Sequence, residues 1–158
     1  MNIFDRIKQD HDAAREVIEK LKNTTERAKK TRQELFDHFK LDMWVHHKVE
    51  EAVFYDILRK TKDMHGEAME AYNEHHVANG LIEELDTFPV DSEEWHVKFK
   101  ALCELVEHHM DEEEEDFFPE ARKLLDKETQ DLMGERFDQR KKVVMAALTP
   151  LELENEPA

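Results

Sequence analysis

Apolar side chains recur every three or four residues along five stretches of the chain, which is the spacing of residues on one face of a helix. No stretch alternates apolar and polar residues for long enough to predict a strand. The pattern therefore predicts an all-α protein. The expected helices, with ends good to a few residues, cover 2–24, 31–60, 62–88, 92–125 and 128–148.

Short polar side chains and prolines mark the expected helix ends. Asn2 is placed to cap the first helix, and Asp91 or Ser92 the fourth, because such side chains accept hydrogen bonds from free N–H groups. Pro89 is expected to end the third helix, since proline cannot extend one. Pro150 is expected to end the fifth in the same way.

Four long helices with short connections predict an up-down-up-down four-helix bundle with an additional C-terminal helix. Pro119 lies inside the fourth helix and predicts a kink or a change of direction there. We expect one metal-binding helical domain over residues 1–148 and a flexible tail over residues 149–158.

The chain contains an internal repeat of two helical hairpins. The first helix aligns with the third at an offset of 64 residues, and the second aligns with the fourth at an offset of 63. Each hairpin thereby supplies one lone histidine from its first helix and a His-x-x-x-Glu pair from its second. The aligned pairs are His11 with His75, His46 with His109, Glu50 with Glu113, Glu51 with Glu114, and Tyr55 with Phe118.

The repeated histidines and glutamates also face the core by helical phase. They sit at mid-height of seams with a seven-residue pattern that is otherwise apolar. Buried without partners, four imidazoles and two carboxylates would each cost several kcal/mol. Metal ions remove this cost, because they bind neutral imidazole nitrogen and neutralise carboxylate oxygen. The predicted metal ligands are His11, His46, Glu50, His75, His109 and Glu113.

A satisfied polar core without metal is the alternative interpretation, because a His-x-x-x-Glu spacing by itself arises often by chance. Three histidine doublets occur, and only one member of each can point squarely inward. Phase and repeat favour His46, His75 and His109. We expect His47, His76 and His108 to lie behind the ligands or on the surface, and His38, His65 and His96 on the surface.

Composition limits the classes of function. The net charge of the 158 residues is −16, which argues against nucleic acid as a partner, because phosphate binding needs a basic surface. No apolar run approaches the ~18 residues of a membrane span, and the charged N-terminus is unlike a signal peptide. Cys103 is the single cysteine and, like Trp44, is expected to pack in the core. We therefore expect a soluble, cytoplasmic protein with no membrane partner.

Four segments carry the predicted ligands, and in order they are IKQDHDAAREVIEKL, HHKVEEAVFYDIL, EHHVANGLIEEL and EHHMDEEEEDFFPEARKLL. Together they resemble the hemerythrin-like, or HHE cation-binding, family, and the resemblance extends over about residues 3–125. The later segment DLMGERFDQRKK also looks like the helix that often follows the bundle in bacterial members. The resemblance implies a non-haem centre of two iron ions held by the same six predicted ligands, with Glu50 and Glu113 as bridges. The donor types alone leave manganese or zinc as alternatives.

One position departs from the oxygen-carrying hemerythrins, whose third helix carries a His-x-x-x-His pair. Asn79 stands four residues after His75 in this chain. The resemblance therefore implies one ligand fewer and a metal ion more open to water or substrate. This argues against simple reversible carriage of dioxygen, and it favours reaction with, or sensing of, dioxygen, peroxide or nitric oxide.

The leading hypothesis is a cytoplasmic di-iron protein that binds or reacts with such small oxygen and nitrogen species, as part of a stress response or as a sensor. Two alternatives use the same centre. One is an enzyme that consumes peroxide, and the other is a protein that stores or delivers iron or repairs iron centres. The sequence leaves open whether the protein is an enzyme and what its oligomeric state is.

Overall fold

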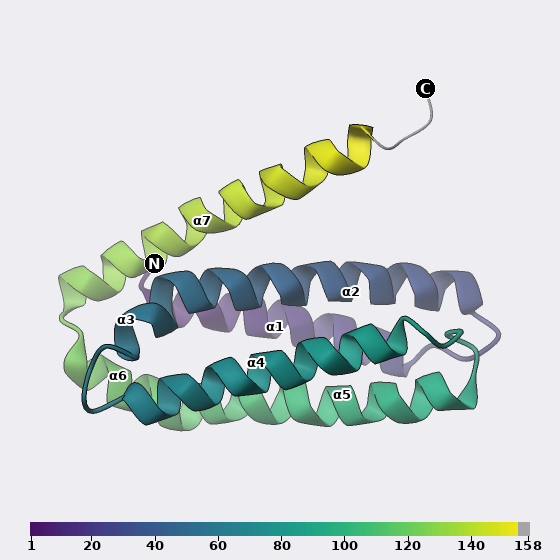
Figure 1. Cartoon of the computed structure of the whole chain (residues 1–158), viewed down its shortest axis with the longest axis horizontal. Helices are drawn as coiled ribbons and strands as arrows, with labels where there is room; N and C mark the ends of the chain where they lie inside the picture. The colour runs from purple at the N-terminus through teal and green to yellow at the C-terminus, as the bar shows by residue number, and fades with distance from the viewer. Residues whose placement is uncertain (155–158) are drawn as a thin grey trace.

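The protein is helical. The computed structural model describes the backbone of residues 1–154 and the side chains of residues 1–148 (Figure 1). No strand occurs in this range, which confirms the predicted all-α class, and none of its helices is long and apolar enough to cross a membrane. The elements are α1 (Ile3–Lys22), α2 (Lys29–Glu50), the π-helical turn η1 (Glu51–Tyr55), α3 (Asp56–Leu58), α4 (His65–Leu85), α5 (Glu93–Glu112), the π-helical turn η2 (Glu113–Phe117), α6 (Phe118–Leu124) and α7 (Lys127–Glu154).

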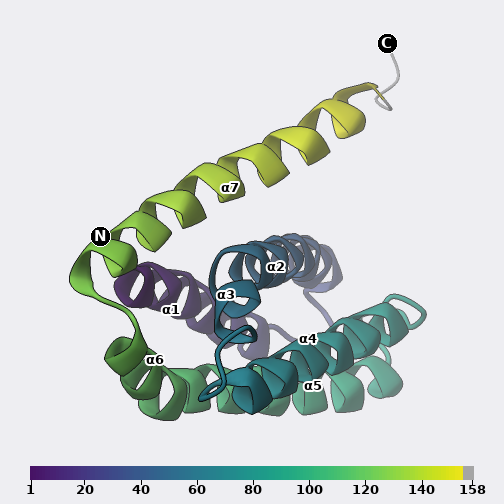
Figure 2. The ribbon, with the colours of Figure 1, turned by 60° about the vertical axis from the view of Figure 1, so that its left-hand side comes forward.

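Four long helices form the bundle. Helices α1, α2, α4 and α5 run in alternating directions, and the chain passes from one to the next at alternate ends (Figure 1). This confirms the up-down-up-down topology. Helix α7 is the additional C-terminal helix. It packs on α1 and α2, and its far end diverges from the bundle (Figure 2).

The predicted caps are present at two helix starts. The side chain of Asn2 accepts a hydrogen bond from the backbone N–H of Asp5 at 2.9 Å. Ser92 rather than Asp91 caps α5, because its hydroxyl oxygen accepts from the N–H of Trp95 at 3.2 Å. Each cap satisfies one of the free N–H groups of the first turn. Helix α4 ends before Pro89, as predicted.

Pro119 and Pro150, the two other prolines for which the sequence predicted an effect, behave differently from each other. Pro119 is the second residue of α6 and follows the π-helical turn η2 directly, so it has no N–H to donate to that turn. Figure 2 shows α6 turning away from the line of α5, so the predicted change of direction is confirmed. The prediction at Pro150 is wrong, because the backbone of α7 stays helical to Glu154. A proline can bend a helix without ending it. The expected tail over 149–158 therefore begins inside α7, and residues 155–158 lie outside the described part.

The two π-helical turns change which residues face the core. Turn η1 comes directly after Glu50, and turn η2 begins at Glu113. Such a turn holds one residue more than an α-helical turn, so it rotates the next part of the helix about its axis. An uninterrupted helix would continue the inward face from Val53 to Ile57. Instead Leu58 is fully buried and Ile57 is only half-buried.

A polar layer divides the apolar core into two clusters. One cluster lies toward the start of α1 and includes Phe4, Phe54 and Phe118. The other lies toward the opposite end of the bundle and includes Phe36 and Trp95. Because apolar packing on both sides fixes the helices, the polar side chains between the clusters are held in place.

Two expectations about core residues have different outcomes. Cys103 is buried, as predicted, and burial raises the pKa of its thiol to about 12. Trp44 is 42% exposed, so its predicted place in the core is wrong. The adjacent Met43 takes the inward position, and successive helical residues point in directions about 100° apart.

Helix α7 crosses the start of α1 at Gly134. A Cβ atom on Gly134 would overlap the carbonyl oxygen of Met1 and would lie 2.9 Å from the carbonyl carbon of Asn2. Phe137, which lies close after Gly134 in α7, is fully buried under the guanidinium of Arg6, with 4.9 Å between that group and the ring centroid. The close approach and the buried ring make α7 an integral part of the fold.

Substitution of Gly134 by alanine should destabilise the protein by about 1–3 kcal/mol, the usual cost of forcing volume into a packed contact. Gly80→Ala is the matched control in the interior of α4, where nothing lies within 4 Å of the added Cβ atom. It should stabilise by about 0.5–1 kcal/mol, because glycine is a poor helix former. Denaturant unfolding of both variants measures the difference. Equal effects would contradict the close packing of α7 on the N-terminus.

Candidate metal centre

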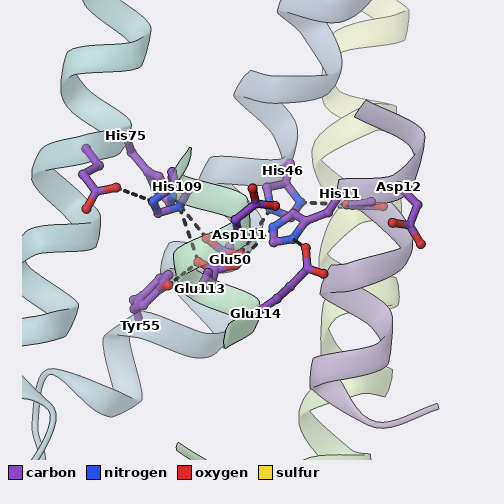
Figure 3. A network of polar contacts seen from close by, with 12 residues as sticks. His11, Asp12, His46, Glu50, Tyr55, His75, His109, Asp111, Glu113 and Glu114 are labelled. Atoms are coloured by element: carbon purple, nitrogen blue, oxygen red, sulfur yellow. Dashed lines mark hydrogen bonds and ion pairs between the residues drawn. The ribbon is translucent and has the colours of Figure 1, made fainter. Parts of the chain in front are cut away.

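The six residues predicted as metal ligands converge between the helices of the bundle (Figure 3). The two glutamates have no exposed surface, and the four histidines are at most 7% exposed. Five of the six come from the four long helices, and the sixth opens the second π-helical turn. They are His11 on α1, His46 and Glu50 on α2, His75 on α4, His109 on α5 and Glu113 on η2.

Each of the two glutamates places its carboxylate oxygens beside two different histidines. In every case the facing histidine atom is Nε2, and the two oxygens of one carboxylate face different rings. The Nε2–oxygen distances are 3.2 Å for His46–Glu50, 3.1 Å for His75–Glu50, 3.1 Å for His11–Glu113 and 3.4 Å for His109–Glu113.

Two groups of these side chains are close enough to hold one ion each. Ligand atoms of His11, His46 and Glu50 all lie within 4.8 Å of one another, and so do those of Glu50, His75 and His109. We refer to them as the His11–His46 half and the His75–His109 half. Since the oxygens of each glutamate face one histidine from either half, both carboxylates are placed to bridge.

Most of the facing atoms lack hydrogen bonds, and this allows a test of whether a cation fits between them. Five of them are buried with no hydrogen-bond partner in the described part of the chain, although opposite charges lie nearby. A buried polar atom without a partner costs about 1–3 kcal/mol, whereas imidazole nitrogen and carboxylate oxygen around one point suit iron, manganese or zinc. The residues therefore fit a metal ion. The five atoms are Nε2 of His11, His75 and His109 and Oε1 of Glu50 and Glu113.

A further carboxylate lies behind each of the four histidines. The Nδ1–H of each ring, on the side away from the centre, donates to it and so directs Nε2 inward. These carboxylates follow the internal repeat. Asp10 and Glu74 come directly before the lone histidines of the two hairpins, and Glu51 and Glu114 come directly after the two inner glutamates. The Nδ1–oxygen distances are 2.8 Å for His11–Glu114, 2.8 Å for His46–Asp10, 2.8 Å for His75–Glu51 and 2.6 Å for His109–Glu74.

Burial and neighbouring charges act in opposite directions on these groups. Burial opposes a charge on His46, but Glu50 and Asp10 outweigh it and raise the pKa of His46 from 6.5 to about 10. The same balance raises the pKa values of the other three ligand histidines. Despite burial, the two histidines beside Glu113 hold the pKa of that carboxyl well below its usual range. A cation that binds here must therefore displace protons.

His47 lies behind a predicted ligand rather than on the surface. Its ring stacks on that of His75 with the centroids 3.9 Å apart, and its Nδ1 lies 3.4 Å from Oδ1 of Asn79. Burial and the nearby histidines hold the pKa of His47 well below 6.5, so the ring is neutral. Asn79 stands at the position where this chain differs from the oxygen-carrying hemerythrins, and it contacts His47. The other histidines outside the ligand set are exposed: His38, His65, His76, His96 and His108.

Tyr55, like Asp10 and Glu74, is a site residue that the sequence patterns did not single out. It is fully buried, and its hydroxyl donates to Oε2 of Glu113 (Figure 3). Burial and the carboxylates of Glu113 and Glu50 raise the pKa of Tyr55 well above 10.0, so the phenol keeps its proton at neutral pH. The available signal was the repeat, which pairs Tyr55 with Phe118 and so marks one hairpin as chemically different.

A cavity of about 70 Å³ lies beside the His11–His46 half. Its outer end carries Asp42 and Lys141, which are partly exposed. A water molecule occupies about 30 Å³ in the liquid, so the cavity has room for a molecule of a few heavy atoms. Apolar side chains make up much of its wall, including Val17, Phe39, Met43 and Met110.

Comparison with known proteins agrees with this fold. The fold matches that of a hemerythrin HHE cation binding domain-containing protein from Mycobacterium kansasii, with a TM-score of 0.78 over 94% of this chain and 93% of that one, at 19% identity. A protein named DNA nickase from Nostoc sp. is 26% identical over 148 residues. That alignment covers 94% of this chain but only 41% of the Nostoc protein.

The hemerythrin HHE cation binding domain family matches residues 2–121. The chain therefore belongs to this family, as the four sequence segments indicated. The matched range includes all six converging side chains and ends within α6, before α7 begins. Cation binding is the property that defines the family.

Adding Fe²⁺ or Zn²⁺ to the metal-free protein at pH 7 should release protons, because each Nε2 must be deprotonated to bind. A pH indicator in weakly buffered solution measures the release, and affinity should rise with pH. The stability of the metal-free protein should instead fall as the pH rises. The contribution of His46 is complete below pH 6.5 and is lost as the pH rises through about 10. Binding without proton release would contradict the proposed involvement of these histidines.

Proposed function

We propose that the protein is a cytoplasmic, non-haem di-iron protein that binds or reacts with small oxygen or nitrogen species such as dioxygen, peroxide or nitric oxide. The observation that carries this proposal is the convergence, inside an otherwise apolar core, of four histidine Nε2 atoms and two carboxylates. Three of the Nε2 atoms and one oxygen of each carboxylate are buried there without a hydrogen-bond partner in the described part of the chain. A role in a stress response or in sensing follows if the centre reports on these species.

In this proposal His11 and His46 would hold one ion, and His75 and His109 would hold the other. The two inner glutamates, whose oxygens lie beside histidines of both halves, would be shared between the ions. The protein would then offer about four donors to each ion. A structural zinc site is complete with four ligands, whereas iron favours six and would keep positions open for a small molecule. Bound iron would supply electron transfer and those open positions.

Protein side chains around the centre position the ligands and control access to it. The four outer carboxylates orient the imidazoles through Nδ1. Tyr55 holds a proton on its phenol oxygen beside Glu113, and its ring centroid lies 6.0 Å from that of His75. The cavity beside His11 and His46 offers a route for a small neutral molecule, because its wall is largely apolar.

The partners expected from the sequence stay part of the proposal. A small diatomic or peroxide ligand matches the size of the cavity. The name of the Nostoc relative refers to DNA, but a net charge of −16 opposes contact with a phosphate backbone. We therefore propose no nucleic acid or membrane partner for this chain.

Iron analysis of protein purified without chelator should give about two ions per chain, as expected for a two-metal site. His46→Ala should lower the iron content, because it removes a nitrogen donor and leaves Glu50 with fewer partners. His38→Ala, on the same helix but with a side chain 62% exposed, is the control and should leave the content unchanged. Stoichiometric zinc, or equal iron in both variants, would count against the proposal.

Filling the cavity should slow ligand entry without removing iron. Ala14 lines the cavity, so Ala14→Leu narrows it. The absorption change on mixing the iron-loaded protein with nitric oxide should become several-fold slower in this variant. Ala146→Leu makes the same change at an exposed position on α7 and should have no effect. Unchanged kinetics in Ala14→Leu, with iron content maintained, would exclude this cavity as the route.

A further inference from the structure

The two halves of the centre differ in the cationic side chains that neutralise their outer carboxylates. The internal repeat makes the halves alike in their histidines, inner glutamates and outer carboxylates. Both inner glutamates face both halves, and they differ in that Oε2 of Glu113, beside His109, also accepts a hydrogen bond from Tyr55. The larger difference in charge between the two halves lies in the next layer outward.

In the His11–His46 half, both outer carboxylates contact cations. Oδ1 of Asp10 lies 2.8 Å from Nη1 of Arg6 and 2.9 Å from Nζ of Lys141. Oε2 of Glu114 lies 2.5 Å from Nη2 of Arg15. The two carboxylate side chains are only 11% and 17% exposed, so water and salt screen these contacts weakly.

The arginines also form ion pairs with other carboxylates, whereas the charge of Lys141 acts on a second carboxylate, Asp42, only at longer range. Arg6 also pairs with Asp138, whose side chain is 50% exposed. Arg15 likewise pairs with aspartates on the outer surface. Lys141 makes its ion pair with Asp10 alone among the described side chains. Lys141 is therefore the positive charge most fully available to the His11–His46 half.

In the His75–His109 half, the outer carboxylates have little cationic support. Glu74 bonds to His109 and has no lysine or arginine within ion-pair distance in the described part of the chain. Glu51 has Lys48 at 4.0 Å, and that lysine side chain is 46% exposed. These two carboxylates keep most of their negative charge available to the histidines that they support.

Lys141 belongs to α7, which lies beyond the residues matched by the family. Phe137, one turn earlier on the same helix, has its ring 5.8 Å from the ring of His46. Lys141 also lines the cavity beside that histidine. Helix α7 thus brings to one side of the centre a charge that the four-helix bundle itself does not contain.

We propose that the two halves bind divalent cations with unequal affinity and that the His75–His109 half fills first, because Lys141, with the two arginines, offsets the outer carboxylates of the other half. A carboxylate behind a metal-bound imidazole strengthens the nitrogen as a ligand, and its charge attracts the ion directly. Both effects are weaker where a cation neutralises that carboxylate. The inference rests on the proposed function, since it requires a metal centre at these residues.

The direction in which metal affinity changes on removal of Lys141 distinguishes an effect of its charge from a role in holding Asp10 in place. If Lys141 served mainly to hold Asp10, its removal would weaken binding in the His11–His46 half. Asp10 keeps its bonds to Arg6 and to His46, however, whatever occupies position 141. Removal of Lys141 therefore takes away a positive charge and leaves the carboxylate oriented. The His11–His46 half should therefore bind its ion more tightly.

Titration of the metal-free protein with Co²⁺, followed by absorption and calorimetry, should resolve two binding steps. Lys141→Met keeps the length of the side chain without its charge. It should tighten the second step about tenfold, the scale of outer-layer effects on metal affinity, and leave the first unchanged. Lys141→Arg keeps the charge and should restore the affinities of the parent chain. Lys142→Met, at the exposed neighbouring position, is the matched control and should change neither step.

Two histidine variants assign the steps to the halves. His75→Ala should abolish the tighter step, and His11→Ala should abolish the weaker one. Two equal steps in the parent chain, or a second step that is unchanged or weaker in Lys141→Met, would overturn the inequality while leaving the metal centre in place. Absence of Co²⁺ binding in the parent chain would instead overturn the proposed function and this inference with it.

Discussion

Glu50 and Glu113 have no exposed surface, and a charged carboxylate in a protein interior is costly unless it is paired and hydrogen-bonded. Much of the surrounding structure counteracts this cost. Each carboxylate faces two imidazoles, each imidazole has a second carboxylate behind it, and on one side those carboxylates meet cations that reach the surface. Charge therefore alternates outward from the centre. A cation at the centre completes this alternation, since it lies between the innermost negative groups.

Packing of the apolar core fixes the positions of the side chains in this polar layer. The clusters around Phe54 and around Trp95 lie on either side of the layer and fix the helices that carry it. The π-helical turns at the inner glutamates then rotate the chain, so that Tyr55 reaches Glu113 from the side. Helix α7 covers the opposite side through Phe137. Packing and site geometry are thus set by the same elements.

Much of the fold and of the candidate site could be predicted because local patterns report them. Helical periodicity gave the helices and their topology, and the cap at Asn2 follows from one short side chain. The six converging residues could be selected because phase and internal repeat both report which side chains face inward. The cost of burying them then indicated a metal.

The rest depends on contacts that local patterns do not encode. The extra residue of each π-helical turn is invisible to a 3.6-residue period, so Leu58 rather than Ile57 became the buried residue. The exposure of Trp44 depends on which neighbour takes the inward position. The contact of Lys141 with Asp10 joins residues far apart in sequence, and no spacing rule relates them.

The lone histidines connect the two hairpins in a particular way. His11 takes its carboxylates from the second hairpin, through Glu113 and Glu114, and His75 takes its own from the first, through Glu50 and Glu51. Neither hairpin is therefore electrically complete alone. If the hairpins move apart, each is left with buried acids and an imidazole that have lost their counterparts, so partial separation is penalised on both sides at once. The bundle should open as a single unit rather than fray along one seam.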